Sequence, residues 1–404
     1  MSDTSFALHE LTFVPEGDEV VVGRLETGSY VVLPTDGAEL LRRLAGGMTP
    51  RQAADWYQTA FGEAVDIGEF VETLHEMGFV RAAGSAEPAA RRPVRWQRLG
   101  RALFSPVSWT VQLTVLVLWL LAAAHHPDLL PAPSQFFFTD SLLLVQLVIL
   151  AAQLPLLCLH EGYHVLAGRR LGLPSRLRLS NRLTYVVAET QMNGLLSVPR
   201  RSRYLPFLAG MLCDAVALGL LGIVADVTRE ADGSFSLTGR VCLALAFTVG
   251  TRLAWQFQLY LRTDLYYVFA TALNCHDLHE ASTALLRNRM WRALGRADRA
   301  VDERQWTEHD RRVGGWYGPF LALGIATFLA TTAFVAVPIV RQYVHIVTTK
   351  LAAGRFDAHF WDAAVSLALN LVQGIALVLL SRNKRQHRHH LPRPLVQSEE
   401  VTPT

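Results

Sequence analysis

The sequence predicts a mainly α-helical, polytopic membrane protein with about six transmembrane helices, preceded by a small α+β domain of winged-helix-like pattern. The composition is the first observation behind this class: 51% of the 404 residues are hydrophobic, and the mean hydropathy is +0.22. Such values are typical of membrane proteins rather than of soluble enzymes. The second observation is a series of apolar segments after residue 104. Most of them reach the roughly 20 residues that a helix needs to cross a bilayer.

Residues 1–84 are expected to form the small domain. Two strands, Val20–Leu25 and Tyr30–Leu33, lie on either side of a turn sequence and indicate a hairpin. Three short helices and a closing strand follow: a helix capped by Thr35-Asp36, a helix from Thr49-Pro50 to about Phe61, a helix capped by Asp66, and the strand Gly78–Val80.

A hairpin followed by three helices occurs in three kinds of domain: a DNA-binding winged helix, a peptide-binding module and a structural cap on a larger core. The second and third helices contain few arginines. The basic surface that contacts DNA phosphates is therefore missing, and we expect no nucleic acid partner. The residues alone leave the peptide-binding module and the structural cap open.

This segment resembles the PqqD-like domain, which recognises leader peptides in ribosomal peptide maturation. The resemblance extends over nearly the whole segment and is carried by Gly28–Leu33, Ala38–Leu41, Met48–Pro50 and Leu74–Val80. It implies that a leader peptide binds as an added strand beside the hairpin, against the third helix. The resemblance makes Tyr30, Val31 and Val32 candidate substrate-binding residues.

The apolar segments follow a basic juxtamembrane linker at residues 85–104. They lie at about Val107–Ala124, Ser141–Leu159, Leu205–Ala225, Val241–Leu261, Trp316–Val340 and Trp361–Leu380. Residues 105–275 are assigned to a membrane core, 276–315 to a cytoplasmic loop, 316–381 to two further transmembrane helices and 382–404 to a basic tail.

The arginines predict the orientation of these segments. Arginines are dense in the linker, in the loops 169–203 and 262–312 and in the tail, whereas the loop 125–140 contains no Lys or Arg. Because positively charged loops stay in the cytoplasm, both termini are expected on the cytoplasmic side of the cell membrane.

The second apolar segment contains an HExxH motif, His160-Glu161-Gly162-Tyr163-His164. On a helix the two histidines lie one turn apart on one face, so both imidazoles can bind one metal ion. Glu161 would project near the open coordination position, where a carboxylate can transfer protons. The motif also occurs as a plain polar helix end. Ionisable residues at membrane depth are costly unless they are paired or metal-bound, which favours a functional site.

A catalytic zinc ion needs a third protein ligand besides His160 and His164. Two carboxylates are candidates: Asp264 follows the fourth segment, and Asp214 lies early in the third. Both are expected at the cytoplasmic level of the membrane, and the residues alone admit either of them.

These segments resemble the site-2 protease family of intramembrane zinc metalloproteases, and in particular its peptide zinc metalloprotease branch. The resemblance covers about residues 140–275 and is carried by His160–His164, Ala209-Gly210 and Asp264 with Tyr266-Tyr267. It implies a Zn²⁺ cofactor held by His160, His164 and Asp264, with Glu161 as the catalytic residue and Asp214 as a substrate- or strand-positioning group.

The sequence departs from the family pattern at two positions. Met211 stands where the family usually has proline, and Leu265 where it usually has glycine. Neither change removes a ligand, but both raise the question of how the local backbone is arranged.

Further motifs have both a functional and a structural interpretation. Strand character around Asn181-Arg182 predicts a hairpin, which either offers an edge to an extended substrate or lies on the surface. The run Cys275–Glu280 is either a second metal site or the start of a solvated helix, and the histidines at 387, 389 and 390 belong to a solvated basic tail.

Together, these features predict a membrane zinc metalloendopeptidase that removes the leader of a ribosomally synthesised precursor peptide. Two alternatives stay open: cleavage of a membrane-tethered transcription regulator, and a non-catalytic binding or export partner. The expected partners are the leader-bearing peptide and the lipid bilayer, and a homo-oligomer is compatible with the sequence.

Overall fold

The computed structural model describes residues 7–25, 27–81, 94–182, 185–192, 194–275, 278–306, 308–352 and 356–388. The structure is 73% helical, which confirms the mainly α class. It divides into two compact units: Met1–Ser105, His164–Leu177 and Thr190–Pro206 form the first, and Pro106–Tyr163, Arg178–Glu189 and Phe207–Thr404 form the second. The boundary crosses helix α6, Leu142–Arg170, which is itself continuous.

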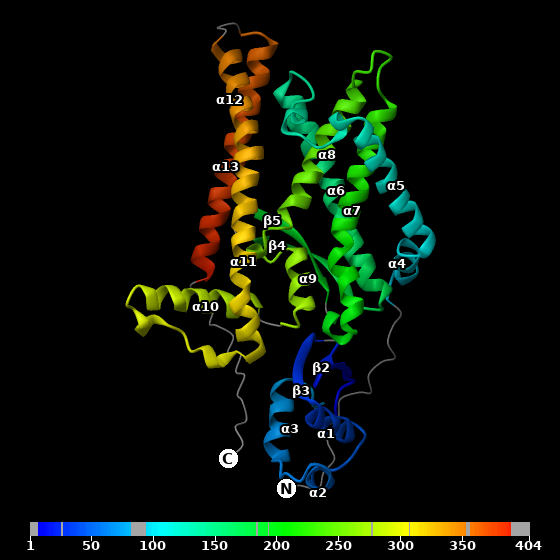
Figure 1. Cartoon of the computed structure of the whole chain (residues 1–404), viewed down its shortest axis with the longest axis vertical. Coiled ribbons are helices and arrows are strands. Elements are labelled where there is room, and N and C mark those ends of the chain that lie inside the picture. Colours follow the sequence, from blue (N-terminus) through cyan, green and yellow to red (C-terminus); the bar gives the residue numbers. More distant parts are fainter. Residues whose placement is uncertain are drawn as a thin grey trace. The chain divides into compact units, whose positions relative to one another are not determined.

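The small N-terminal domain contains a three-stranded antiparallel sheet in the order β1-β2-β3 (Figure 1). Strands β2 (Glu19–Arg24) and β3 (Ser29–Pro34) form the predicted hairpin, with Val21 opposite Val32. Strand β1 (Thr12–Glu16) was not predicted because Pro15 interrupts its pattern. Proline cannot donate to a ladder, but an edge strand such as β1 tolerates it.

The three predicted helices of this domain are α1 (Thr35–Ala45), α2 (Pro50–Phe61) and α3 (Ile67–Glu76). Two caps are confirmed: Thr49 forms a capping box with Gln52, and the Asp66 side chain accepts from the backbone of the first turn of α3. Helix α1 itself is confirmed, but its predicted cap at Thr35-Asp36 was wrong. Pro34 is its N-cap, without a side-chain bond, and the Thr35 hydroxyl donates to the Asp18 carbonyl instead.

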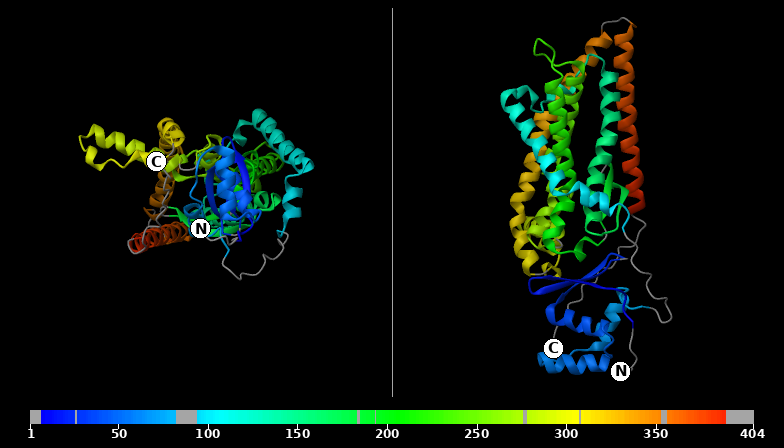
Figure 2. Two further views of the ribbon diagram at one scale, coloured as in Figure 1. Left: turned by 90° about the horizontal axis from the view of Figure 1, so that it is seen from below. Right: turned by 90° about the vertical axis from the view of Figure 1, so that its right-hand side faces the viewer.

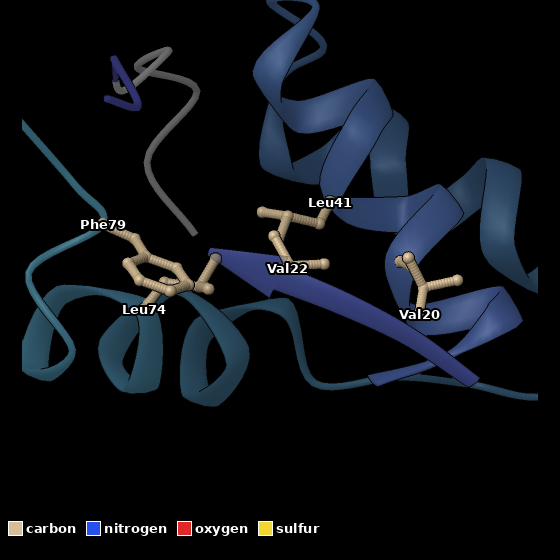
Figure 3. Packing of buried hydrophobic residues seen from close by; sticks show 6 residues of the cluster. Val20, Val22, Leu41, Leu74 and Phe79 are labelled. Carbon is tan, nitrogen blue, oxygen red and sulfur yellow. The ribbon is translucent and has the colours of Figure 1, made fainter. Parts of the chain in front are cut away.

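The core of the domain forms where β2 meets α1 and α3. Figure 3 shows Val20 and Val22 of β2 with Leu41, Leu74 and Phe79 around them. Each of these side chains is at most 3% exposed. Burying a side chain of this kind contributes about 1.5–3 kcal/mol, so this cluster orders the sheet against its helices.

Five helical stretches of the described residues are long and apolar enough to cross a membrane: α5 (Pro106–His125), α6, α7 (Arg200–Val227), α8 (Leu237–Trp255) and the stretch Glu308–Ala352. Helices α5 to α8 lie side by side (Figure 1), and Trp119, Leu156, Leu218 and Val249 pack together from all four. In the most apolar parts of α5 and α6 only 11% of the residues are buried, as expected for helices that face lipid.

The last two predicted segments both lie in helices that extend beyond the predicted bounds. Helix α11 (Glu308–Thr331), the π-helical turn η7 (Thr332–Ala336) and α12 (Val337–Ala352) run on without a break. The sixth segment forms α13 (Ala358–Arg388), which lies beside α12 in the views of Figures 1 and 2 but is not among the five candidate spans of the described chain. The Asp362 carboxylate of α13 accepts bonds from the backbone N–H groups of Leu142 and Leu143, at the start of α6.

The remaining elements connect these helices. They are α4 (Gln97–Leu103), the 3-10 turns η1 (Pro127–Leu129) and η2 (Pro133–Phe136), β4 (Ser175–Arg182), β5 (Tyr185–Met192), η3 (Leu195–Ser197), η4 (Leu259–Leu261), α9 (Asp264–Ala272), α10 (Leu278–Ala293), η5 (Ala297–Arg299) and η6 (Glu303–Gln305). Strands β4 and β5 confirm the hairpin predicted around Asn181-Arg182. The side chains of residues 176–193, residues 85–93 of the linker and residues 389–404 of the tail lie outside the described part.

Candidate metal centre

Helix α6 carries the HExxH motif in regular helical backbone. His160 and His164 are one turn apart and only 5% and 3% exposed. Glu161 follows His160 directly and is 6% exposed. Three buried ionisable side chains on one turn of an apolar helix are costly without partners, and the histidines have such partners on other elements.

Asp264 reaches this turn of α6 from the start of α9. Its backbone N–H donates to the Gln256 side chain at 3.1 Å, and the Thr263 hydroxyl donates to the Gln256 carbonyl at 2.6 Å. Just before them, Arg262 has a φ of 55°, which a residue other than glycine rarely adopts. The sharp turn at Arg262 and the two bonds to Gln256 hold the start of α9 in place.

His160, His164 and Asp264 each offer a ligand atom, and these atoms lie within 4.8 Å of one another. The His160 Nε2 atom is 3.4 Å from the Asp264 Oδ2 atom. Two imidazoles and one carboxylate are a common ligand set of catalytic zinc sites. Among the described residues, this is the group that could hold a metal ion.

The Nδ1 atom of each imidazole has a hydrogen-bond partner other than Asp264. The His164 Nδ1–H group donates to the Pro206 carbonyl at 2.7 Å. The His160 Nδ1 atom lies 3.0 Å from the Asp214 Oδ2 atom. In both imidazoles an acceptor therefore occupies Nδ1, which leaves Nε2 as the nitrogen suited to a metal.

Asp214 lies on the other side of the His160 ring from Asp264. It is 0% exposed, and besides His160 it accepts two bonds from the Arg252 guanidinium, at 2.8 and 2.5 Å. Asp214 is therefore neither in the ligand group nor exposed to a substrate; it lies behind His160. Arg252 was not predicted as a partner of this site, although an arginine inside an apolar segment usually has a carboxylate partner.

The two departures from the family pattern leave the backbone regular. Met211 lies within the continuous helix α7, and Leu265 is the second residue of α9. Neither position needs the proline or glycine of the family pattern to bring Asp214 and Asp264 to His160.

Comparison with known proteins adds no relative. No protein-family model, curated protein or solved structure matches the chain.

The candidate substrate-binding residues of β3 differ in their surroundings. Val31 packs against the core of the domain, whereas Val32 is 39% exposed. Tyr30 is half-buried; burial raises the pKa of its phenol, and the nearby Ser197 hydroxyl and the charge of Arg203 partly offset the rise. Strand β3 is an outer strand of the sheet. An added strand would therefore bond to the backbone of β3, whereas the Val31 side chain packs into the core and would not touch the added strand.

A contact within the first compact unit was not predicted. The Arg203 guanidinium forms an ion pair with Glu16 of β1, and it also donates to the carbonyls of Leu196 and Val198 at 3.0 Å each. Residues 194–203 thereby pack against the N-terminal sheet, next to Tyr30.

The described residues do not support a second metal site at Cys275–Glu280. His276 and Asp277 lie outside the described part of the chain. The Cys275 thiol contacts the Asp310 carboxylate at 2.8 Å, and burial lowers the pKa of His279. Helix α10 begins at Leu278, in accord with the predicted start of a helix.

His389 and His390 are outside the described residues, as is the side chain of His387.

Proposed function

We propose that the protein is a membrane zinc metalloendopeptidase. The observation that carries this proposal is the group formed by the buried His160 and His164 and the partly exposed Asp264, with the buried Glu161 beside the first histidine. These residues fit zinc: two imidazoles and one carboxylate leave a fourth position open, and both Nδ1 atoms are already bonded. Zinc held there would activate a water molecule and polarise the carbonyl of a peptide bond.

Glu161 has the role of a general base and acid in this proposal. Its carboxylate would take a proton from the attacking water and return it to the nitrogen of the leaving amine. Glu161 is only 6% exposed, and a carboxylate shielded from bulk solvent suits such a proton transfer.

The proposed substrate is a ribosomally synthesised precursor peptide whose leader is removed at the cytoplasmic face of the cell membrane. The N-terminal domain would recruit the leader as a fourth strand along the outer edge of β3. The arginine-rich loops support this orientation, with both termini in the cytoplasm. Cleavage of a membrane-tethered regulator would use the same chemistry, and the genes that neighbour this one would distinguish the two substrates.

Zinc stoichiometry tests the proposal. We expect about one zinc per chain in the wild-type protein purified in detergent, and a loss of zinc in Asp264→Ala. Glu308→Ala is the control, because Glu308 is a 79% exposed carboxylate at the start of α11, paired with Arg312. Zinc retained in Asp264→Ala would remove this aspartate from the ligand set. A wild-type protein that takes up no zinc, even when zinc is supplied, would contradict the enzymatic proposal.

A further inference from the structure

The buried carboxylate of Asp214 has an unusual place for a charged group. It lies on α7, in a span of apolar residues, and is 0% exposed. Its Oδ2 atom accepts from His160 Nδ1 at 3.0 Å and from Arg252 Nε at 2.8 Å, while Oδ1 accepts from the terminal nitrogen of Arg252 at 2.5 Å. A buried ion pair is weak evidence for a stabilising role, since desolvation offsets the attraction of its charges.

The orientation of the His160 ring gives a better explanation of why a carboxylate is buried at this position. Its Nδ1 atom faces Asp214, and its Nε2 atom faces Asp264 Oδ2 at 3.4 Å. A hydrogen bond from Nδ1–H to a carboxylate selects the tautomer in which Nε2 keeps its lone pair, and it makes Nε2 a stronger ligand. His164 differs, because the acceptor at its Nδ1 is the neutral carbonyl of Pro206.

We propose that Asp214 is the positioning residue of His160, and that Arg252 is the counter-ion that holds the Asp214 carboxylate in place. This inference rests on the proposed metal site. It replaces the substrate-positioning role expected for Asp214 with a role in which Asp214 acts on the metal through His160.

Arg252 is itself held by a second contact, so that the network joins three helices. Its third guanidinium nitrogen donates to Gln153 Oε1 at 3.2 Å, and the Gln153 amide donates to Thr248 of α8. Gln153 lies seven residues before His160 on α6, which is two turns along the same face. The planar guanidinium can reach both oxygens of Asp214 and also Gln153, which a lysine ammonium cannot do with the same geometry.

The test is the zinc affinity of the full-length protein in detergent, measured by competition with a chelator. We expect Asp214→Asn to weaken zinc binding by about 10- to 100-fold, the usual effect of losing such a partner. Asp226→Asn is the matched control: Asp226 lies on the same helix and is paired with Arg229 at 2.9 Å, and its loss should leave the affinity unchanged. Equal affinity of wild type and Asp214→Asn would overturn this inference alone. No zinc binding by the wild type would overturn the proposed function as well.

A double variant separates the positioning of His160 by Asp214 from the effect of the Arg252 charge on zinc. In Asp214→Asn the Arg252 cation loses its partner and would repel zinc, whereas Asp214→Asn with Arg252→Gln contains neither charge. The double variant is also the one expected to fold if the single variant does not, because no buried charge is left unpaired. A double variant that still binds zinc about 10- to 100-fold more weakly supports positioning. Recovery of wild-type affinity would overturn it.

The visible absorption spectrum of the cobalt(II)-substituted protein provides a second test. This spectrum would not change if Asp214 only stabilised the fold. The absorption bands report the ligand field at the metal, and hence the basicity and orientation of His160. We expect them to shift in Asp214→Asn and in the double variant, but not in Asp226→Asn. Unchanged bands in the double variant would show that Asp214 does not act through His160.

Discussion

The Arg203 guanidinium and the Glu16 carboxylate form an ion pair in which each side chain is only 5% exposed. Glu16 ends strand β1, and Arg203 lies in the first turn of α7. The pair therefore connects the N-terminal sheet to the segment that begins a predicted membrane span, within one compact unit.

Removing one partner of this pair should destabilise the contact more than removing both. We expect Arg203→Ala or Glu16→Ala alone to lower the free energy of unfolding by about 3–5 kcal/mol, because the remaining charge stays buried without its partner. The double variant should lose less than the sum. Thermal unfolding of the full chain in detergent, arranged as a double-mutant cycle, measures this coupling. The exposed Arg201 provides the control: Arg201→Ala should change the stability by at most about 0.5 kcal/mol. Additive losses would show that the pair makes no specific contribution.

Glu161→Gln tests the chemistry of the site separately from metal binding. We expect processing of the cognate precursor in membranes to fall by about 10²- to 10⁴-fold, because the amide cannot accept the proton of the attacking water. Zinc content should stay near the wild-type value, since Glu161 is not one of the three grouped ligands. Elemental analysis and a cleavage assay on the same preparation check both parts. Processing at the wild-type rate would exclude Glu161 as the base.

Tyr57 should make the stability of the N-terminal domain depend on alkaline pH. Burial raises the pKa of Tyr57, and the hydrogen bond with Asp36 and the negative charge of Asp36 raise it further, to about 12. In the unfolded chain a tyrosine titrates near pH 10. The stabilising effect of the protonated hydroxyl is thus fully present below about pH 10, and it is lost as the pH rises to about 12.

Tyrosinate absorbance of the full chain checks this shift. The difference between the titration curves of wild type and Tyr57→Phe should show one group with a pKa of about 12. In Asp36→Asn the same group should titrate closer to 10, because the negative charge beside it is gone. A group near 10 in the wild type would contradict the predicted shift.

Gly100 of α4 should not tolerate a side chain. A Cβ atom at this position would lie 2.3 Å from the Leu166 carbonyl oxygen and 3.1 Å from the Arg170 backbone nitrogen. We expect Gly100→Ala to cost about 1–3 kcal/mol, because α4 must move away from the end of α6. Gly374→Ala on α13 is the matched control, as nothing lies within 4 Å of its Cβ position. Alanine there should be neutral or stabilising by up to about 1 kcal/mol, and thermal unfolding compares the two. Equal effects would show that α4 does not depend on close packing at Gly100.

Some elements could be predicted closely because their signals are local. Thr49-Pro50 marks the start of α2 and Asp66 that of α3, since capping depends on residues within one turn. The apolar segments predicted α5 to α8 for a similar reason: a helix that faces lipid must be apolar over its whole length. The predicted end of the fourth segment, at Leu261, was less accurate, because α8 ends at Trp255 and the 3-10 turn η4 follows.

The HExxH motif is also a local signal, so the sequence by itself determined His160, Glu161 and His164 as the candidate site. It left two carboxylates open for the third position, because Asp214 and Asp264 are 54 and 104 residues away from His160 in the chain. Only the tertiary structure decided which carboxylate meets which nitrogen of His160: Asp264 lies at Nε2, whereas Asp214 lies at Nδ1 with Arg252 behind it. The physical reason is that the two nitrogens of one imidazole point in different directions, and the packing of α7, α8 and α9 around α6 sets which partner each nitrogen meets.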